Sequence, residues 1–188
     1  MQKGQGTTQD VFDVCAELML SVRDAEFPVI AAVNGLATAG GCQLVAMCDL
    51  AIVSDTSSFA TPGVKIGLFC TTPGVALARA IPSKAAMLML LSGNSLSATE
   101  ALQLGLVSKV VSAEALEAEV QQLAATIAQA ATATVRLGKK AFYEQAAMPD
   151  VRAAYALASD VMVENMKSPD AQEGIAAFIE KRAPKWTS

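Results

Sequence analysis

The segment best suited to chemistry joins an apolar strand, a glycine-rich turn and an apolar helix, and it runs from Phe27 to Val53. Val29–Val33 is a short apolar run rich in β-branched residues, and Asn34-Gly35 follows it as a turn signal. Ala39-Gly40-Gly41 then removes side-chain bulk directly before a helix predicted at Cys42–Cys48. The first N–H groups of a helix have no partner within it, and the helix dipole favours negative charge there. The segment therefore predicts a site for an oxyanion near Gly40.

Several motifs, in this order, resemble the crotonase (enoyl-CoA hydratase/isomerase) superfamily. They are PVIAAVNG, AGGCQL, CDLAIVSD and SFATPGVKIGL, followed by SATEALQLGLVSKVV and EGIAAFIEKR. The resemblance runs from Asp10 to Trp186, and Gly-Cys-Gln together with Thr-Pro-Gly resembles a mitochondrial group of the family. It implies an α/β fold, a crotonase-like spiral of repeated ββα units that is truncated at the N-terminus. Residues 1–112 form this partial core, and residues 113–188 form a helical trimerisation region of the same domain.

The resemblance also implies a ligand, because family members bind a coenzyme A thioester and stabilise its carbonyl oxyanion with two backbone N–H groups. Gly40 matches the position of one donor. The other donor belongs to N-terminal strands that this chain lacks, so we expect a fragment, a splice form or a truncated product. The simpler interpretation of Gly40 and Gly41 is that they only permit a tight turn between strand and helix.

The chain departs from the family pattern at the two catalytic glutamates of the hydratases. Gln43 takes the place of the first, and its amide can hold a water but cannot accept its proton. Gly63, directly after Pro62, takes the place of the second and has no side chain. We therefore expect no ordinary hydration of an enoyl-CoA. If the scaffold is otherwise intact, Gln43→Glu with Gly63→Glu should restore some of it.

Few other residues are candidates for acid, base or nucleophile. Lys65 and Cys70 lie in a loop that family sites recruit, but a solvated lysine and a buried thiol are the favoured interpretations. Asp49 is expected to orient the strand Leu50–Val53, and Asp55 to form a turn. The chain has no histidine, which removes Ser-His, Cys-His and His-based zinc sites. The cysteines show no CxxC pair, so we expect reduced, buried thiols, no disulfide and no metal, at the positions Cys15, Cys42, Cys48 and Cys70.

Composition favours one globular domain inside the cell. The chain has 188 residues, 53% of them hydrophobic, and a net charge of −4, with no basic tract that would bind nucleic acid. Charged or polar residues interrupt every apolar run before it reaches the length of a membrane span. The N-terminus shows no import signal. The resemblance implies the mitochondrial matrix, and the missing signal leaves the cytoplasm as the alternative.

Periodicity predicts mostly helices outside the strands. The first helix, Asp10–Asp24, should turn an apolar stripe to the core. Ser97-Ala98-Thr99-Glu100 is a capping box for a helix that ends near Gly105, before the strand Val107–Val111. The remaining helices are predicted at 83–91, 113–130, 134–147, 151–167 and 171–182. The Met87-Leu88-Met89-Leu90 run should pack in the core or line an acyl chain.

In family trimers a neighbouring subunit's last helices cover part of the coenzyme A. The matching positions here are Met162, Phe178 and Lys181, of which Lys181 either pairs with a phosphate or is a surface residue at a helix C-terminus. The expected partners are therefore acyl-CoA as ligand, with no other cofactor, and copies of this chain in a trimer or hexamer.

Three functions remain open. The first is an acyl-CoA-binding protein linked to fatty-acid metabolism, without hydratase activity. The second is an enzyme that performs other chemistry on a CoA thioester, such as decarboxylation or isomerisation, with other residues. The third is a structural subunit of a crotonase-family oligomer.

Overall fold

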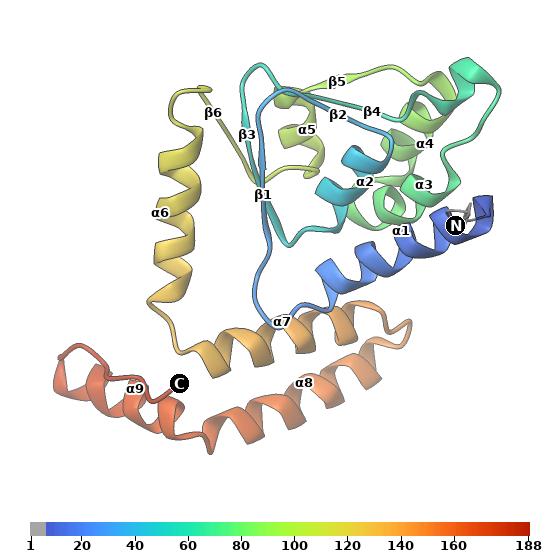
Figure 1. Cartoon of the computed structure of the whole chain (residues 1–188). Coiled ribbons are helices and arrows are strands. Elements are labelled where there is room, and N and C mark those ends of the chain that lie inside the picture. The colour runs from blue at the N-terminus through green and yellow to red at the C-terminus, as the bar shows by residue number, and fades with distance from the viewer. Residues whose placement is uncertain (1–6) are drawn as a thin grey trace, which may run out of the picture. The chain divides into compact units, whose positions relative to one another are not determined.

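The computed structural model describes residues 7–188 and divides into two compact units (Figure 1). Of the described residues, the first unit holds 7–25 together with Val29–Gln122, and the second holds Glu26–Pro28 with Leu123–Ser188. Within the described residues, no helix combines the length and the apolar character that crossing a membrane requires. The predicted division after residue 112 stays a prediction about the domain, since these units reflect packing alone.

The first helix, α1 (Thr8–Arg23), begins at a capping box that the sequence did not predict. Thr7 Oγ1 accepts from the N–H of Asp10, and Asp10 Oδ2 accepts from the N–H of Thr7. The prediction that the apolar stripe of this helix faces the core was wrong for most of the stripe. Among its members Val14 is 70% exposed and only Met19 is buried, because α1 packs against the first unit along one edge, on α2.

Two consecutive ββα repeats form the centre of the first unit. The first repeat contains β1 (Ile30–Val33), β2 (Leu36–Thr38) and α2 (Gly40–Met47). The second contains β3 (Leu50–Ser54), β4 (Ser58–Ala60), the 3₁₀ helix η1 (Pro62–Ile66) and α3 (Thr71–Ala80). Corresponding strands pair in parallel, β1 with β3 and β2 with β4, so the chain winds as a spiral. The predicted spiral of ββα units is confirmed.

The spiral continues through α4 (Ser83–Ser92), β5 (Leu96–Ser97), α5 (Ala98–Leu104) and β6 (Lys109–Val111). β6 extends the sheet of β1 and β3 in parallel, and β5 pairs antiparallel with β4, so the described strands form two three-stranded sheets. The predicted capping box is confirmed, with Ser97 as N-cap and Gly105 in the left-handed conformation at the C-terminus of α5. The core lies between the sheets and helices α2 to α5 and includes Cys42, Val53, Phe59, Leu77 and Met89.

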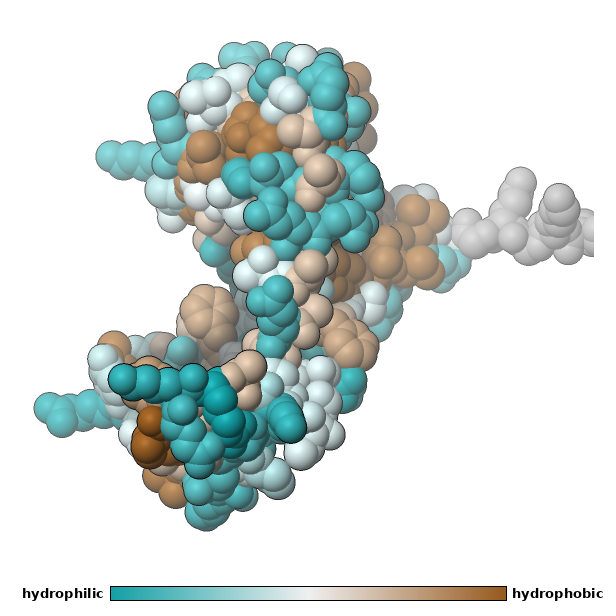
Figure 2. Space-filling view, turned by 90° about the vertical axis from the view of Figure 1, so that its left-hand side faces the viewer, coloured by the Kyte–Doolittle hydropathy of each residue, from teal (hydrophilic) through white to brown (hydrophobic). Residues whose placement is uncertain are grey.

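The second unit is helical. Its elements are the end of α6 (Leu116–Ala128), then α7 (Thr132–Ala146), α8 (Val151–Met166) and α9 (Pro169–Glu180). Pro169 opens α9 at its first turn, two residues before the predicted start of this helix at residue 171. α7 and α8 pack on each other, and neither buries a single side chain fully. Apolar side chains consequently remain at the surface, as the brown residues of Figure 2 show.

Candidate functional site

The turn from β2 into α2 holds a strained residue directly before the glycines. Ala39 has φ 48° and ψ −113°, a conformation that an L side chain adopts at a cost of about 1–3 kcal/mol. Two backbone hydrogen bonds fix it: its N–H donates to the carbonyl of Ala60, and its carbonyl accepts from the N–H of Gln43, each at 2.9 Å. These two hydrogen bonds therefore fix the position at which α2 begins.

Gly40 and Gly41 form the first turn of α2, and neither is needed for the conformation of the turn. Neither has a positive φ, and a Cβ at either position would meet no atom within 4 Å. Beside both glycines, where a side chain would begin, there is open space. The simpler interpretation, in which the glycines only permit the turn, is not supported, because the strain lies on Ala39. An open approach to the first N–H groups of a helix suits an anionic oxygen.

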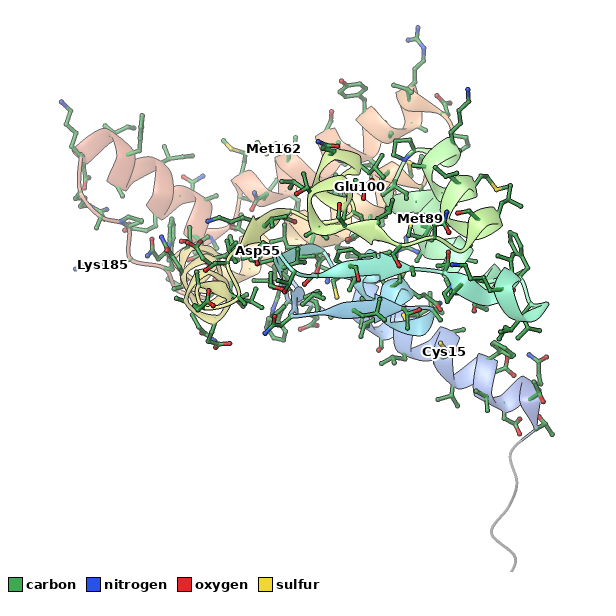
Figure 3. All side chains as sticks on the ribbon, turned by 90° about the horizontal axis from the view of Figure 1, so that it is seen from above. Cys15, Asp55, Met89, Glu100, Met162 and Lys185 are labelled. Carbon is green, nitrogen blue, oxygen red and sulfur yellow. The ribbon has the colours of Figure 1, made fainter. Side chains whose placement is uncertain are left out.

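Gln43 lies on the same helix, where it is buried with 5% of its surface exposed. Its Oε1 lies 3.9 Å from the sulfur of Cys15, a weak thiol hydrogen bond that reaches across from α1. Figure 3 shows Cys15 on α1 beside α2. A neutral amide in this position can orient a water but cannot take its proton near neutral pH.

Gly63 follows Pro62 in η1, and its surroundings are closed. A Cβ there would lie 2.8 Å from Cys70 Sγ and 2.9 Å from the carbonyl oxygen of Leu68. A glutamate, which must extend from such a Cβ, cannot stand at this position unless the backbone of residues 68–70 moves. The expectation that Gln43→Glu with Gly63→Glu restores some hydration stays a prediction, and it requires this movement. The thiol and carbonyl fill the place that a side chain would need.

The cysteines around the site are free thiols. Burial, with a smaller contribution from Cys70, raises the pKa of Cys42 to about 12, so this thiol stays neutral and inert at physiological pH. Cys70 is half-buried and precedes α3 as its N-cap residue. The prediction of four buried thiols was wrong, because Cys15, Cys48 and Cys70 are each partly exposed. Among the described residues no cluster of acidic, cysteine or histidine side chains is arranged to hold a metal ion.

One polar atom near Gly63 was not anticipated. Thr61, directly before Pro62, is fully buried, and its Oγ1 is the one buried side-chain polar atom without a hydrogen-bond partner in the described part of the chain. An isolated threonine carries no sequence signal for such an environment. Leaving it unpaired costs stability, on the order of 1–3 kcal/mol.

The remaining candidate residues of the first unit are Lys65, Asp49 and Asp55, and the structure gives each a structural role or an exposed position. Lys65 is exposed, and its stem lies against Gly93 at the end of α4. Asp49 Oδ2 accepts from the N–H of Val29 at 2.6 Å, so it orients the start of β1 against β3 as expected. Asp55 is exposed in the turn between β3 and β4, also as expected.

The three residues expected to reach a neighbouring subunit's coenzyme A lie in the second unit. Met162, labelled in Figure 3, is on α8 and is 59% exposed. Phe178 on α9 is 85% exposed, and Lys181 closes α9 in the left-handed conformation with φ 53°. Gly40, Gln43, Gly63 and Cys70, in contrast, belong to the first unit.

Comparison with known proteins agrees with the motifs. The family model "Enoyl-CoA hydratase/isomerase" matches residues 1–188. The mouse protein called enoyl-CoA hydratase domain-containing protein 3, mitochondrial, is 54% identical over 185 residues, which are 98% of this chain and 61% of the mouse protein. A probable mitochondrial enoyl-CoA hydratase of Dictyostelium discoideum is 40% identical over 166 residues, 85% of this chain and 57% of its own. The chain therefore spans less than two thirds of the length of these relatives.

Solved structures show the same fold. The crystal structure of human enoyl-CoA hydratase domain-containing protein 3 superposes with a TM-score of 0.92 at 54% identity, covering 95% of this chain and 70% of that one. An enoyl-CoA hydratase from Mycobacterium smegmatis gives a TM-score of 0.94 at 44% identity, covering 100% of this chain and 74% of that one. With its ββα spiral and its match to the family model along the whole length, the chain belongs to the enoyl-CoA hydratase/isomerase family, the crotonase superfamily.

Proposed function

We propose that this chain binds the thioester end of an acyl-CoA without hydrating it. The first N–H groups of α2, at Gly40, would donate hydrogen bonds to the thioester carbonyl oxygen, because a Cβ there meets open space and the dipole of α2 favours negative charge. Gln43, buried on the same helix, would face the ligand as a neutral amide.

The proposed absence of hydration rests mainly on Gly63. Hydration needs a group that takes a proton from water and a group that returns one, and each is worth about 10²–10⁴-fold. At Gly63 the chain has no side chain, and a Cβ there would lie 2.8 Å from Cys70 Sγ and 2.9 Å from the Leu68 carbonyl oxygen. At Gln43 the amide cannot act as a base. The arrangement supports binding and polarisation of a thioester without activation of water.

Calorimetry tests the proposal. We expect saturable binding of short, medium or long acyl-CoA that exceeds the binding of free coenzyme A, and no hydration of crotonyl-CoA at a rate ordinary for the family. Gly40→Ala should weaken acyl-CoA binding by placing a methyl group in the open space. Gly138→Ala on α7 is the matched control, since a Cβ there also meets nothing within 4 Å.

Equal acyl-CoA affinity of Gly40→Ala and the unaltered chain would refute the role of Gly40. Rapid hydration of crotonyl-CoA would refute the absence of hydratase activity. The alternative of an enzyme with other chemistry, such as decarboxylation, rests on the same open helix terminus, because an oxyanion site alone carries much of such a reaction. Release of carbon dioxide from a malonyl-type thioester would favour it.

The alternative function, a structural subunit of an oligomer, rests on an exposed apolar face of α8 in the second unit. Tyr155, Met162 and Met166 share one face of α8, and each is between 46% and 72% exposed. We propose that this face is covered by other copies of the chain in a trimer, or a hexamer of two trimers, and that Met162, Phe178 and Lys181 contact a neighbour's coenzyme A there. We also propose a location in the mitochondrial matrix and a link to fatty-acid metabolism; the word mitochondrial in the names of relatives supports the mitochondrial part of this proposal. Fractionation of cells that express the full-length protein would test the location.

A further inference from the structure

The helix α4 is apolar on two opposite faces, although one of them faces solvent. Ala86, Met89 and Leu90 are buried against the core, and Figure 3 labels Met89 on this helix. On the opposite side Met87, Leu88 and Leu91 are 47%, 65% and 61% exposed. A helix that is apolar all round is ordinarily covered on both sides, so the outer stripe is expected to have a partner.

The end of η1 adds to this stripe. η1 packs against α4, and a Cβ on Gly93 at the end of α4 would lie 3.2 Å from Lys65 Cε. Ile66 and Leu68, just beyond Lys65, are 76% and 64% exposed. In Figure 1 η1 and the loop after it lie beside α4 at one edge of the first unit. We call these apolar residues the α4 patch: Ile66, Leu68, Met87, Leu88 and Leu91.

The charged residues along the segment that carries the α4 patch have one sign. From Thr56 to Thr99 the sequence contains Lys65, Arg79 and Lys84 and no aspartate or glutamate, although the whole chain has a net charge of −4. Lys65 and Lys84 are exposed on the two elements that carry the patch. A second copy docked symmetrically through this segment would bring its lysines together, and the segment has no acidic residue to pair with them, which disfavours self-association here.

We propose that the α4 patch binds the surface of a bilayer that contains anionic lipid. Leu88, Met87 and Leu91 enter the boundary between headgroups and acyl chains, and Lys65 and Lys84 lie among the lipid phosphates. An apolar stripe with flanking lysines is the composition that interfacial binding requires, through buried apolar area and attraction to anionic headgroups. The inference is independent of the proposed acyl-CoA site, since it uses no residue of that site.

Co-sedimentation of the full chain with vesicles tests this inference. We expect binding to phosphatidylcholine vesicles that contain phosphatidylglycerol, weaker binding to pure phosphatidylcholine, and release by added salt. Leu88→Glu should lower the partition coefficient by roughly tenfold or more, since it removes a buried leucine from the boundary. Lys65→Ala and Lys84→Ala should each lower it by about fivefold.

Val14→Glu on α1 is the matched control, because Val14 is 70% exposed and lies on a different helix of the same unit. It should leave vesicle binding unchanged. The proposal is overturned if the unaltered chain does not sediment with anionic vesicles, or if Leu88→Glu and Val14→Glu behave alike. It is also overturned if Leu88→Glu instead changes the mass of the particle in light scattering, which would make the patch a contact between copies.

Discussion

Gly40 and Gly63 are both glycines of the candidate site, but their surroundings differ. Gly40 has open space where a Cβ would stand, and Gly63 has a sulfur and a carbonyl oxygen there. Substitution by alanine should therefore affect acyl-CoA binding at Gly40 and the stability of the fold at Gly63.

Gly63→Ala should lower the free energy of unfolding by about 1–3 kcal/mol, because the loop at residues 68–70 has to move to admit the methyl group. Gly40→Ala should keep the fold and even stabilise it slightly, since alanine is the better helix former. Urea denaturation of both variants checks the contrast. Adding Cys70→Ala to Gly63→Ala should recover part of the loss, because it removes the sulfur but leaves the Leu68 carbonyl. Equal stability of the two single variants would contradict the closed environment of Gly63.

Replacement of Ala39 by glycine should stabilise the folded chain. Relief of its positive φ favours the folded state by about 1–3 kcal/mol, and the greater freedom of glycine in the unfolded chain opposes this by about 0.5–1 kcal/mol. The net expectation for Ala39→Gly is a gain of about 1 kcal/mol in the free energy of unfolding, measured by thermal and urea denaturation. A loss of stability would show that the turn relaxes without strain.

Sequence motifs identified the candidate residues, but not the surroundings that bear on their chemistry. Gly40, Gln43 and Gly63 could be found because the motifs around them are continuous in the chain. The contact of Gly63 with Cys70 depends on how η1 folds back toward α3, and the strain at Ala39 depends on two hydrogen bonds, one of them to β4. No local pattern of residue types contains either piece of information.

At the scale of elements, local signals were the reliable ones. Ser97 and Gly105 fix both ends of α5 through interactions within a few residues, and the prediction was correct. β2 and β4 have three residues each and no periodicity, so only pairing makes them strands, β2 with β4 and β4 also with β5. The apolar spacing of α1 correctly gave a helix, but the spacing could not say how little of the stripe the rest of the unit covers.

The end of the chain is fastened to α9 by carboxylates of that helix. Asp170 Oδ1 accepts from the Thr187 N–H and hydroxyl, and Asp170 Oδ2 accepts from the Ser188 hydroxyl. Glu173 accepts from Arg182 at 2.5 and 2.9 Å and from the Lys185 N–H at 2.7 Å. Figure 3 marks Lys185 in this segment. The hydrogen bonds from Arg182, and then that from the Lys185 N–H, lower the pKa of Glu173 from 4.5 to about 2.

Acid should release this fastening. Because the folded pKa of Glu173 lies below the unfolded value, its stabilising contribution is complete above about pH 4.5 and is lost as the pH falls toward about 2. The Ser188 hydroxyl and then the Thr187 N–H lower the pKa of Asp170 in the same direction. Trp186, the single tryptophan of the chain, donates its Nε1–H to the Gln129 carbonyl and should report the release by fluorescence.

Glu173→Gln should weaken the fastening at neutral pH and remove most of the fluorescence change between about pH 4.5 and about pH 2. Glu164→Gln, on the exposed surface of α8, is the control and should leave the titration unchanged. A transition of the same size and midpoint in Glu173→Gln would assign the acid response to other carboxylates.

At the scale of the whole molecule, the helices α7 and α8 of the second unit contribute no fully buried side chain to a hydrophobic core in the described chain. α8 nevertheless carries an apolar face. Sequence periodicity gave these helices correctly, but it cannot distinguish a face covered by the same chain from one covered by another. Only the exposure of the folded chain makes that distinction.

Tyr155 is the position where a charge should separate the proposed trimer. It is 72% exposed on the same face of α8 as Met162 and Met166, so Tyr155→Glu should not disturb the fold of one chain. In a trimer the new carboxylate would be buried without a partner, which is strongly unfavourable. Light scattering coupled to size exclusion should show three chains of 19.4 kDa for the unaltered protein and a smaller particle for Tyr155→Glu.

Ala153→Glu provides the comparison, because it adds the same charge two residues away on the opposite, exposed side of α8. It should leave the particle mass unchanged. Circular dichroism of both variants must show the same helix content, so that a smaller particle reports a lost contact and not an unfolded chain. An unaltered protein that runs as a single chain at every concentration would contradict the proposed trimer and, with it, the contacts of Met162, Phe178 and Lys181 with a neighbour's coenzyme A.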